Sequence, residues 1–458
     1  MARKKENLTS AERLEEALVP EGEQPYPVPG NWCWMRGRAF LKPMETKRPE
    51  GEVFRYIDID SIDNKRQQVT EPKNLQVKDA PSRASRKLRT GDTVFSMVRP
   101  YLMNIAYIDE TISNSIASTG FYVCTPTENV NSLYLYYLMT SPYTVDGLNR
   151  YMKGDNSPSI RKDDIENYVY PIPPLPEQQR IVNRIESLFA KLDEAKQKAQ
   201  DALDSFETRK AAILHKAFTG ELTAQWRKEH GVGMKSWENL RLENLIEGGP
   251  QNGLYKPQTA YGTGTKILRI DCFYEGAVLP WENLKRLALS KNEIEQYHLN
   301  INDIVINRVN SMAYLGKSAL IRELPEECVF ESNMMRITLN TRMVIPEYAI
   351  KYLNSVIGVQ ELRKNAKQAV NQASINQQDV KNVAIKLPKL DEQAEIVRIL
   401  DDLLAKEQQA KEAAEGVLEQ IDLIKKAILA RAFRGELGTN DPSEESAQEL
   451  IKNFIFKM

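Results

Sequence analysis

The sequence predicts an α+β protein in which two α/β domains are separated by two long helices that pair as an antiparallel coiled coil. Three observations lead to this prediction. Two segments carry almost the same residues, IPPLPEQQRIV from Ile172 and LPKLDEQAEIV from Leu387. Each segment continues into about 40 residues with an apolar repeat of helical period. A region of roughly 150 residues with short β-type stretches precedes each segment. Because the same order of domain and helix occurs twice, we expect a pseudo-twofold internal repeat.

The length and composition limit the class of protein. The 458 residues suffice for about two to four domains. With 41% hydrophobic and 27% charged residues, the composition is that of an ordinary soluble protein. The chain has no run of about 18 apolar residues, and its N-terminus lacks the apolar core of a secretory signal. We therefore expect a cytoplasmic protein that does not contact a membrane. The widely spaced cysteines fit a reducing compartment; they are Cys33, Cys124, Cys272 and Cys328.

The repeated segments are copies of one another. Aligning Glu177 with Glu392 gives an offset of 215 residues, and no gap is needed afterwards. Between Pro174 and Leu222, 21 of 49 positions are identical in the second copy. The match closes with AFTGEL in the first copy and AFRGEL in the second. Self-similarity over this length indicates an internal duplication.

Each copy reads as one long helix. Prolines precede both copies, and Gly220 and Gly435 follow them, as is typical of helix starts and ends. Apolar residues recur at steps of four and three, which is a coiled-coil pattern, and only Arg209 and Glu407 interrupt the two rows. We predict that the helices pair with each other; alternatively, each packs on its own domain or joins two chains. The predicted seam consists of Ile181, Ile185, Leu188, Leu192, Phe206, Ile213, Ile396, Leu400, Leu403, Val417, Ile421 and Ile428.

The regions before the helices share weak anchors. Gly91–Val94 corresponds to Asn302–Val305, and the sequences diverge between such matches. One fold that carries two different surfaces suits a protein that reads two different things. The predicted segments are an N-terminal docking segment (1–28), a first domain (29–172), a first long helix (173–222), a linker (223–236), a second domain (237–386), a second long helix (387–438) and a C-terminal tail helix (439–458).

Basic and amide residues in the two domains suggest contact with nucleic acid. Residues 36–99 contain 15 Lys or Arg and 9 Asp or Glu, although the whole chain has a formal net charge of −1. Arg and Lys suit phosphates and guanine edges, whereas Asn and Gln suit adenine edges. The plain alternative is a set of solvated surface charges. The candidate base contacts flank two strands whose alternation predicts one polar face; they are Arg83, Arg86, Lys87, Arg99, Lys256, Asn307, Arg308 and Asn310.

Two loops at equivalent places in the repeat, just before each long helix, add candidate contacts to the DNA backbone. They read KGDNSPSIRK in the first copy and NQASINQQ in the second. Positive and amide side chains in such loops suit phosphate oxygens. These candidates are Lys153, Arg161, Asn371 and Gln372.

The sequence contains no recognisable catalytic motif. The three histidines, His215, His230 and His298, are too scattered for a metal site. No GxxxxGK[ST] phosphate loop occurs. The Asn- or Asp-Pro-Pro-aromatic motif of an adenine methyltransferase is also missing, because the one Pro-Pro pair is followed by Leu175. We therefore expect no catalytic residue, metal or cofactor in this chain.

Two divergent domains, each followed by a helix that opens with PLPEQQRIV or KLDEQAEIV and closes with AFTGEL or AFRGEL, resemble the specificity subunit of type I restriction-modification systems. The resemblance implies two target-recognition domains that each read half of a split sequence in double-stranded DNA. It also implies two modification subunits that methylate adenine at N6 with S-adenosylmethionine. Restriction and translocase subunits would add cleavage that uses ATP and Mg²⁺. The specificity subunit itself would carry no catalysis.

Two other functions compete with this interpretation. A self-contained nuclease–methyltransferase conflicts with the missing methyltransferase motif and the modest length. A structural coiled-coil adaptor without DNA readout remains an alternative. At the ends of the chain, SAERLEEAL and SAQELIKNF have similar patterns. They suggest short helices that dock a partner or close a ring, or else two unremarkable terminal helices.

Overall fold

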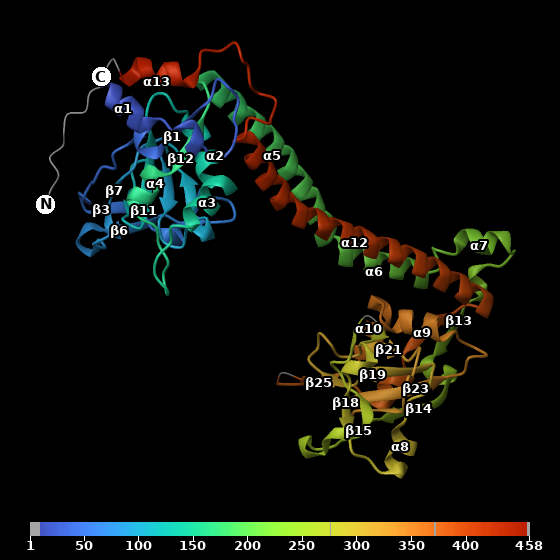
Figure 1. Cartoon of the computed structure of the whole chain (residues 1–458). Coiled ribbons are helices and arrows are strands. Elements are labelled where there is room, and N and C mark those ends of the chain that lie inside the picture. The colour runs from blue at the N-terminus through green and yellow to red at the C-terminus, as the bar shows by residue number, and fades with distance from the viewer. Residues whose placement is uncertain (1–9, 275, 371, 456–458) are drawn as a thin grey trace. The chain divides into compact units, whose positions relative to one another are not determined.

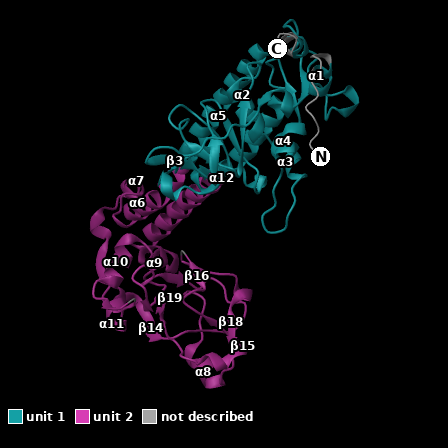
Figure 2. Cartoon of the chain, turned by 90° about the vertical axis from the view of Figure 1, so that its left-hand side faces the viewer, with its two compact units in different colours: residues 1–199, 416–458 teal, residues 200–415 magenta. Residues whose placement is uncertain are grey.

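The computed structural model describes residues 10–274, 276–370 and 372–455 of the chain. It divides into two compact units, which Figure 2 shows in teal and magenta. Unit 1 comprises residues 1–199 and 416–458, and unit 2 comprises residues 200–415. Each unit thus combines one mixed α/β domain with one part of each long helix. Asn371, a candidate contact to the DNA backbone, lies outside the described residues.

The domain of unit 1 consists of short strands and three short helices. Its main sheets have the strand orders β6-β3-β10-β7 and β2-β11-β8-β9, and β1 pairs with β12. The bounds are β1 Cys33–Arg36, β2 Leu41–Lys42, β3 Val53–Ile57, β4 Ile62–Asp63, β5 Gln68–Val69, β6 Lys73–Gln76, β7 Ala84–Lys87, β8 Thr93–Ser96, β9 Ile105–Tyr107, β10 Ile116–Ser118, β11 Phe121–Pro126, α2 Ser132–Thr140, α3 Pro142–Asn149, α4 Lys162–Asn167 and β12 Val169–Ile172.

The domain of unit 2 repeats this plan. Its sheets have the strand orders β14-β23-β19-β21 and β18-β15-β22, and β13 pairs with β26. The bounds are β13 Glu238–Arg241, β14 Ile246–Asn252, β15 Tyr261–Leu268, β16 Phe273–Tyr274, β17 Ala277–Val278, β18 Lys285–Leu287, α8 Lys291–Tyr297, β19 Asp303–Asn307, β20 Val309–Asn310, β21 Ser318–Leu320, β22 Cys328–Phe330, β23 Met334–Leu339, α9 Pro346–Leu353, α10 Val356–Arg363, β24 Lys367–Ala369, β25 Gln372–Ser374, α11 Gln377–Lys381 and β26 Ala384–Leu387.

Matching details show that the two domains are copies of one fold. Each has a parallel strand pair, β10 with β3 and β22 with β15. The turn into the central strand has a positive φ in both copies, 89° at Gly91 and 71° at Asn302. The Asp that follows accepts a backbone N–H three residues upstream in both, over 2.7 Å. The weak anchors in the sequence therefore do mark equivalent positions.

The central strands β8 and β19 are buried over their whole length. The sequence-based expectation that alternation leaves one polar face on each strand is therefore wrong. Helices and the second sheet cover both faces of these strands, so that even their polar residues are enclosed. The polar candidates next to them must act from the loops where the strands end.

The long helices are α5 (Leu175–Asp204), α6 (Phe206–Phe218) and α12 (Leu390–Ala432) (Figure 1). Within unit 1, α5 contacts the last part of α12, and Asp193 forms an ion pair of 2.6 Å with Lys425. Within unit 2, α6 contacts the middle of α12, where the Lys411 ammonium lies 5.0 Å from the centre of the Phe206 ring. In each unit the residue numbers rise on one helix as they fall on the other. The paired segments therefore run antiparallel.

The two residues that interrupt the predicted apolar rows meet each other. Arg209 donates to a Glu407 carboxylate oxygen over 2.8 Å. This ion pair is partly exposed, with side chains 36% and 21% accessible. It favours one register of the two helices, because a shift by one residue would leave both charges unpaired. The predicted breaks in the pattern are thus one interhelical contact.

The first long helix is interrupted at Ser205, whereas its copy in α12 is continuous. The Ser205 hydroxyl donates to the Asp201 carbonyl over 2.7 Å, and Arg209 donates to the Ala202 carbonyl. Side chains that bond carbonyls of their own helix compete with its backbone ladder and bend it. The prediction of one unbroken helix therefore needs this correction.

The predicted seam residues differ in how much they are covered. Several are buried, namely Ile181, Ile185, Phe206, Ile396, Leu400 and Ile421. Others are half-buried, namely Leu188, Leu192, Ile213, Leu403 and Ile428. Val417 is 39% exposed, contrary to its predicted place. A straight helix drifts by about 20° per heptad from a strict seven-residue repeat. Three heptads after Ile396, that drift turns Val417 away from the covered row, which passes through Ala414.

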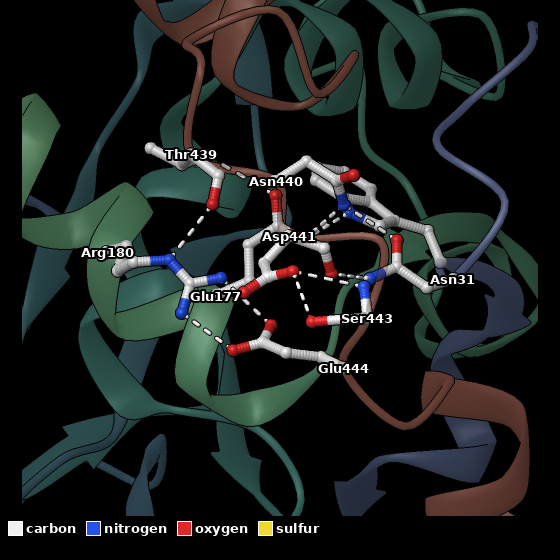
Figure 3. A network of polar contacts seen from close by, with 9 residues as sticks. Asn31, Glu177, Arg180, Thr439, Asn440, Asp441, Ser443 and Glu444 are labelled. Carbon is white, nitrogen blue, oxygen red and sulfur yellow. Dashed lines mark hydrogen bonds and ion pairs between the residues drawn. The ribbon is translucent and has the colours of Figure 1, made fainter.

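Within unit 1, a buried glutamate at the start of α5 binds both the first domain and the chain that follows α12. Glu177 accepts the Trp32 indole N–H over 2.8 Å and the Asn440 amide over 2.9 Å. The Thr439 hydroxyl donates to its other oxygen over 3.3 Å. Beside it, Arg180 holds Glu444 through two bonds of 2.8 and 2.9 Å (Figure 3). We refer to these contacts as the Glu177 cluster.

Unit 2 has a matching cluster at the start of α12. Glu392 accepts the Trp237 indole N–H over 2.9 Å and the Thr223 hydroxyl over 2.7 Å. It also accepts the Arg227 guanidinium over 2.6 Å. Arg227 belongs to α7 (Ala224–Glu229), and its second nitrogen donates to the Gly220 carbonyl. We refer to these contacts as the Glu392 cluster. Both clusters fix a domain to the base of a long helix.

The first and last helices of the described residues meet within unit 1. Helix α1 (Ser10–Ala17) contacts α13 (Ala447–Ile455). Ala17, Ala447 and Ile451 belong to the same apolar core as α5 and the end of α12. Both helices therefore pack within unit 1, and their role in docking a partner or closing a ring stays a prediction.

Candidate nucleic-acid interface

In unit 1, two loops from distant parts of the sequence pair with each other. The β8–β9 loop (residues 97–104) lies against the pre-α4 loop (residues 153–159). Arg99 donates its backbone N–H to the Pro158 carbonyl over 2.8 Å. The Arg99 guanidinium donates to the Asn156 carbonyl over 2.7 Å. The two loops therefore form one surface element.

This element gathers three predicted contacts. Arg99, Lys153 and Arg161 are all exposed. Two backbone bonds with Ser159, of 2.9 and 3.0 Å, hold the Lys153 backbone in the loop. The backbone is fixed, Lys153 and Arg161 are exposed, and the Arg99 guanidinium is bound to a neutral carbonyl. The surface is therefore suited to bind phosphate oxygens.

Unit 2 has the same element in a more regular form. Strand β20 pairs with β25, and β25 pairs with β24. The result is a small three-stranded ribbon beside the β19–β21 loop (residues 308–317). Ile375 donates its backbone N–H to the Arg308 carbonyl over 2.9 Å, as Ile160 does to Met97 in unit 1. The paired loops of unit 2 therefore also form one surface element.

A polar hollow of about 430 Å³ lies next to the ribbon. The Arg308 side chain reaches it and donates to the Ser332 carbonyl over 3.0 Å. The Arg308 Nε is buried without a hydrogen-bond partner. The side chains around the hollow are donors or amides, and carboxylates are missing from them: Asn252, Arg308, Asn376, Gln377, Gln378 and Lys381. This composition favours a ligand rich in acceptors, such as a nucleic acid.

Two other predicted cations, Lys87 and Lys256, already have carboxylate partners. Lys87 and Arg89 both bind Glu45, and their hydrogen bonds lower the pKa of this carboxyl to about 2. Lys256 lies 2.6 Å from Glu293. Its hydrogen bond, with those of Ser290, lowers the pKa of Glu293 to about 2. A DNA phosphate would have to displace these partners, so these cations are weaker candidates than Arg99.

The other candidates differ in exposure. Arg83 and Gln372 are exposed, whereas Arg86 and Asn310 are half-buried. The Arg86 Nε is buried without a hydrogen-bond partner. The structure differs from the prediction at Asn307, which is only 1% exposed at the end of β19. Its side chain cannot reach a base in this conformation because the strand is covered on both faces.

The sequence interpretation missed the apolar residues of the paired loops. Tyr101 and Leu102 are 47% and 39% exposed in the β8–β9 loop, and Met312 and Tyr314 are 36% and 47% exposed in the β19–β21 loop. The available signal was the position of these residues, directly after two buried strands at equivalent places in the repeat. Apolar residues next to predicted strands usually belong to a core, so their exposure could not be expected from the sequence.

Within the described ranges, no group of three or more His, Cys, Asp or Glu side chains could hold a metal ion. No helix among the same residues is long and apolar enough to cross a membrane.

Comparison with known proteins identifies the family. The model of the type I restriction modification DNA specificity domain matches residues 36–203 and again residues 234–416. The specificity subunit of the EcoKI type I restriction enzyme from Escherichia coli K12 is 26% identical over 430 residues, 92% of this chain and 90% of the relative. The StySPI specificity subunit from Salmonella potsdam is also 26% identical, over 93% of this chain and 91% of the relative.

A solved structure agrees with these relatives. The HsdS subunit of Thermoanaerobacter tengcongensis has a TM-score of 0.67 and 26% identity, over 90% of this chain and all but 1% of that one. The duplicated domains, the helix pair and the paired basic loops define a protein with two nucleic-acid-reading domains on a helical scaffold. This chain belongs to the family of type I restriction-modification DNA specificity subunits, in which the two matched domains recognise DNA.

Proposed function

We propose that the chain reads a bipartite DNA target, with one half-site for each domain. The observation that carries this proposal is the repetition of one surface element. Each domain has a pair of loops with exposed or half-exposed basic residues, Arg99 in one and Arg308 in the other. Because the surrounding residues differ between the copies, each domain would prefer a different half-site. The predicted helix seam would act as an antiparallel coiled coil that holds the two readers.

The chain would contribute recognition and no catalytic group. Two modification subunits would bind S-adenosylmethionine and methylate adenine at N6. Restriction and translocase subunits would bring ATP and Mg²⁺, and the complex would work in the cytoplasm. Support comes from a structure with a TM-score of 0.68 and 26% identity, described as showing complex assembly of the type I R-M system. The repeat would offer two equivalent docking surfaces, one for each modification subunit.

The test compares Arg99→Ala and Arg308→Ala in a host that carries the chain with its modification subunit. Sequencing of the methylated sites gives the target of each variant. We expect each variant to relax one position in one half-site only, at about 1–3 kcal/mol if the guanidinium holds a guanine edge. Lys198→Ala, which alters a lysine 74% exposed on α5, serves as a control and should leave the target unchanged.

Other outcomes separate the alternatives. Equal weakening on every sequence would make the arginine a phosphate contact. A complex that methylates without sequence preference, and that shifts no duplex in an electrophoretic assay, would favour the structural coiled-coil adaptor.

A further inference from the structure

The β8–β9 loop of unit 1 holds an unusual backbone. Arg99 and Met103 have φ values of 47° and 56°, in the left-handed region that residues with a Cβ rarely adopt. They bracket one short 3-10 helix, Pro100–Leu102. Such conformations persist where the surroundings enforce them, and they concentrate at functional sites. The loop therefore has a fixed shape that local sequence preference does not explain.

The effect of this shape is to present two apolar side chains to water. Pro100 is buried and anchors the loop. Tyr101 and Leu102 stand 47% and 39% exposed on its outer side. From the β4–β5 turn, the Asn64 amide donates to the Leu102 carbonyl over 2.9 Å and supports the tip. A held, exposed aromatic beside Arg99 is suited to contact a ligand.

Unit 2 repeats the arrangement with different residues. In the β19–β21 loop, Met312 and Tyr314 are 36% and 47% exposed, while Leu315 between the loop and the core is fully buried. Arg363 donates to the Leu315 carbonyl over 2.8 Å and to the Ala313 carbonyl over 3.2 Å. The same loop thus carries an exposed aromatic, held from beneath, in both copies of the fold.

We propose that Tyr101 in unit 1 and Tyr314 in unit 2 are specificity-determining residues that contact thymine 5-methyl groups in the major groove. This inference rests on the proposed DNA-reading function. The basic residues on the same loops would bring both tips against the DNA. The thymine methyl is the apolar group that base edges present in the major groove. Each ring has a cation near it on its own loop, Arg99 for Tyr101 and Lys317, whose ammonium lies 4.2 Å from the centre of the Tyr314 ring. The ring would read that methyl while the cation binds a phosphate or a guanine.

The experiment uses the full chain assembled with its modification subunits. A randomised duplex library is selected on this complex to give the preferred target. Each thymine of that target is then replaced by deoxyuridine, which removes only the methyl group. We expect the wild-type complex to lose about fourfold in affinity at one thymine of each half-site. Tyr101→Ala should lose about the same factor on the thymine duplex and show no further loss on the deoxyuridine duplex.

Further variants keep the test independent of folding. Tyr101→Phe retains the ring and should keep the sensitivity to the methyl group. Tyr314→Ala should cause the same loss of affinity, and the same insensitivity to deoxyuridine, at a thymine of the other half-site. Val53→Ala, which alters a residue 53% exposed on β3, should behave like the wild type. An unchanged melting temperature checks that Tyr101→Ala is folded.

The outcomes distinguish this inference from the proposed function. A complex that selects no sequence overturns both. If a target is selected but no thymine responds to loss of its methyl, the inference fails and the proposed function stands. If Tyr101→Ala weakens thymine and deoxyuridine duplexes by the same factor, the ring does not read the methyl and the inference is again wrong.

Discussion

Glu177 and Glu392 occupy the same position of the repeat, yet different groups surround their carboxylates. Both accept an indole N–H, from Trp32 and Trp237. In unit 2 the cation Arg227 completes the cluster over 2.6 Å. In unit 1 the amide of Asn440 takes part at 2.9 Å instead. One buried charge can therefore be stabilised by an ion pair in one copy and by neutral donors in the other.

The difference arises where the two copies diverge. The shared contacts come from within the repeat, as does the glutamine that follows each glutamate. Gln178 and Gln393 each accept a backbone N–H, from Asn131 and Ile345, over 2.7 and 2.8 Å. The variable donors come from the chain after Gly220 in one case and after Gly435 in the other. The duplication thus retained the buried acceptor, while each following segment supplied its own donors.

The largest expected effect is that of Arg227→Ala. Its guanidinium is 8% exposed and the Glu392 carboxylate 2%, so this change leaves a buried charge without its ion-pair partner. Such changes cost about 3–5 kcal/mol. Urea denaturation followed by tryptophan fluorescence gives the loss of unfolding free energy. Hydrogen exchange should show that the loss of stability is greatest in the first turns of α12. A loss below about 1 kcal/mol would show that the ion pair does not hold this cluster together.

Asn440→Ala tests the corresponding contact in unit 1 and should have a smaller effect. It removes one hydrogen bond to a charged acceptor, worth about 1.5–3 kcal/mol, and a second one of 2.7 Å to the Asn31 amide oxygen. The Trp32 and Thr439 bonds to Glu177 remain. Backbone amides at the start of α5 should exchange faster than in the wild type. Amides of α12 before Ala414 should exchange at the wild-type rate. An effect as large as that of Arg227→Ala would mean that amide and cation contribute equally.

Glu444→Gln should have a smaller effect still. Glu444 binds Arg180 through two bonds, but the arginine is 39% exposed and solvent screens the pair. We expect about 0.2–1 kcal/mol, in the range of exposed ion pairs. The melting temperature, measured at low and high salt, should show a difference that shrinks with salt. A salt-independent loss would point to the geometry of the chain after α12 rather than to charge.

The double variant Arg227→Met, Glu392→Gln should have the smallest effect. It removes both charges, and the glutamine oxygen can still accept the Trp237 indole N–H. The glutamine NH2 then faces the Thr223 hydroxyl, which can turn to accept from it. Replacing both partners of a buried ion pair by neutral groups of similar size is often close to neutral. Comparison with each single variant in a double-mutant cycle gives the coupling between them. A double variant as unstable as Arg227→Ala would show that the cation is needed for more than charge balance.

The helix scaffold was largely predictable because a repeat of apolar residues directly specifies a long helix. The predicted ends are confirmed by positive φ values at Gly220 and Gly435, 84° and 75°. The interruptions at Arg209 and Glu407 were visible in the sequence, but their pairing was not. That contact depends on which helix faces which, and a one-dimensional pattern contains no such information.

The candidate site was predictable only in part. Arg99, Lys153 and Arg161 were predicted from their places after a strand and in the loop before the first long helix, and all three are exposed. Their contact with DNA stays a prediction. Asn307 was misjudged because strands covered on both faces and strands covered on one face look alike over five residues. Tyr101 was missed because exposure depends on how a loop is held, here by Asn64 and a buried proline.

The sequence by itself determined the duplication, the two long helices, the type of the domains and the lack of known catalytic motifs, since these depend on local composition and period. Only the tertiary structure decided which loops meet, which cations remain free of carboxylates, and which groups balance Glu177 and Glu392. These features are contacts between residues far apart in the chain. They depend on the three-dimensional packing, which brings Trp32 to Glu177 and Trp237 to Glu392 across about 150 positions of sequence.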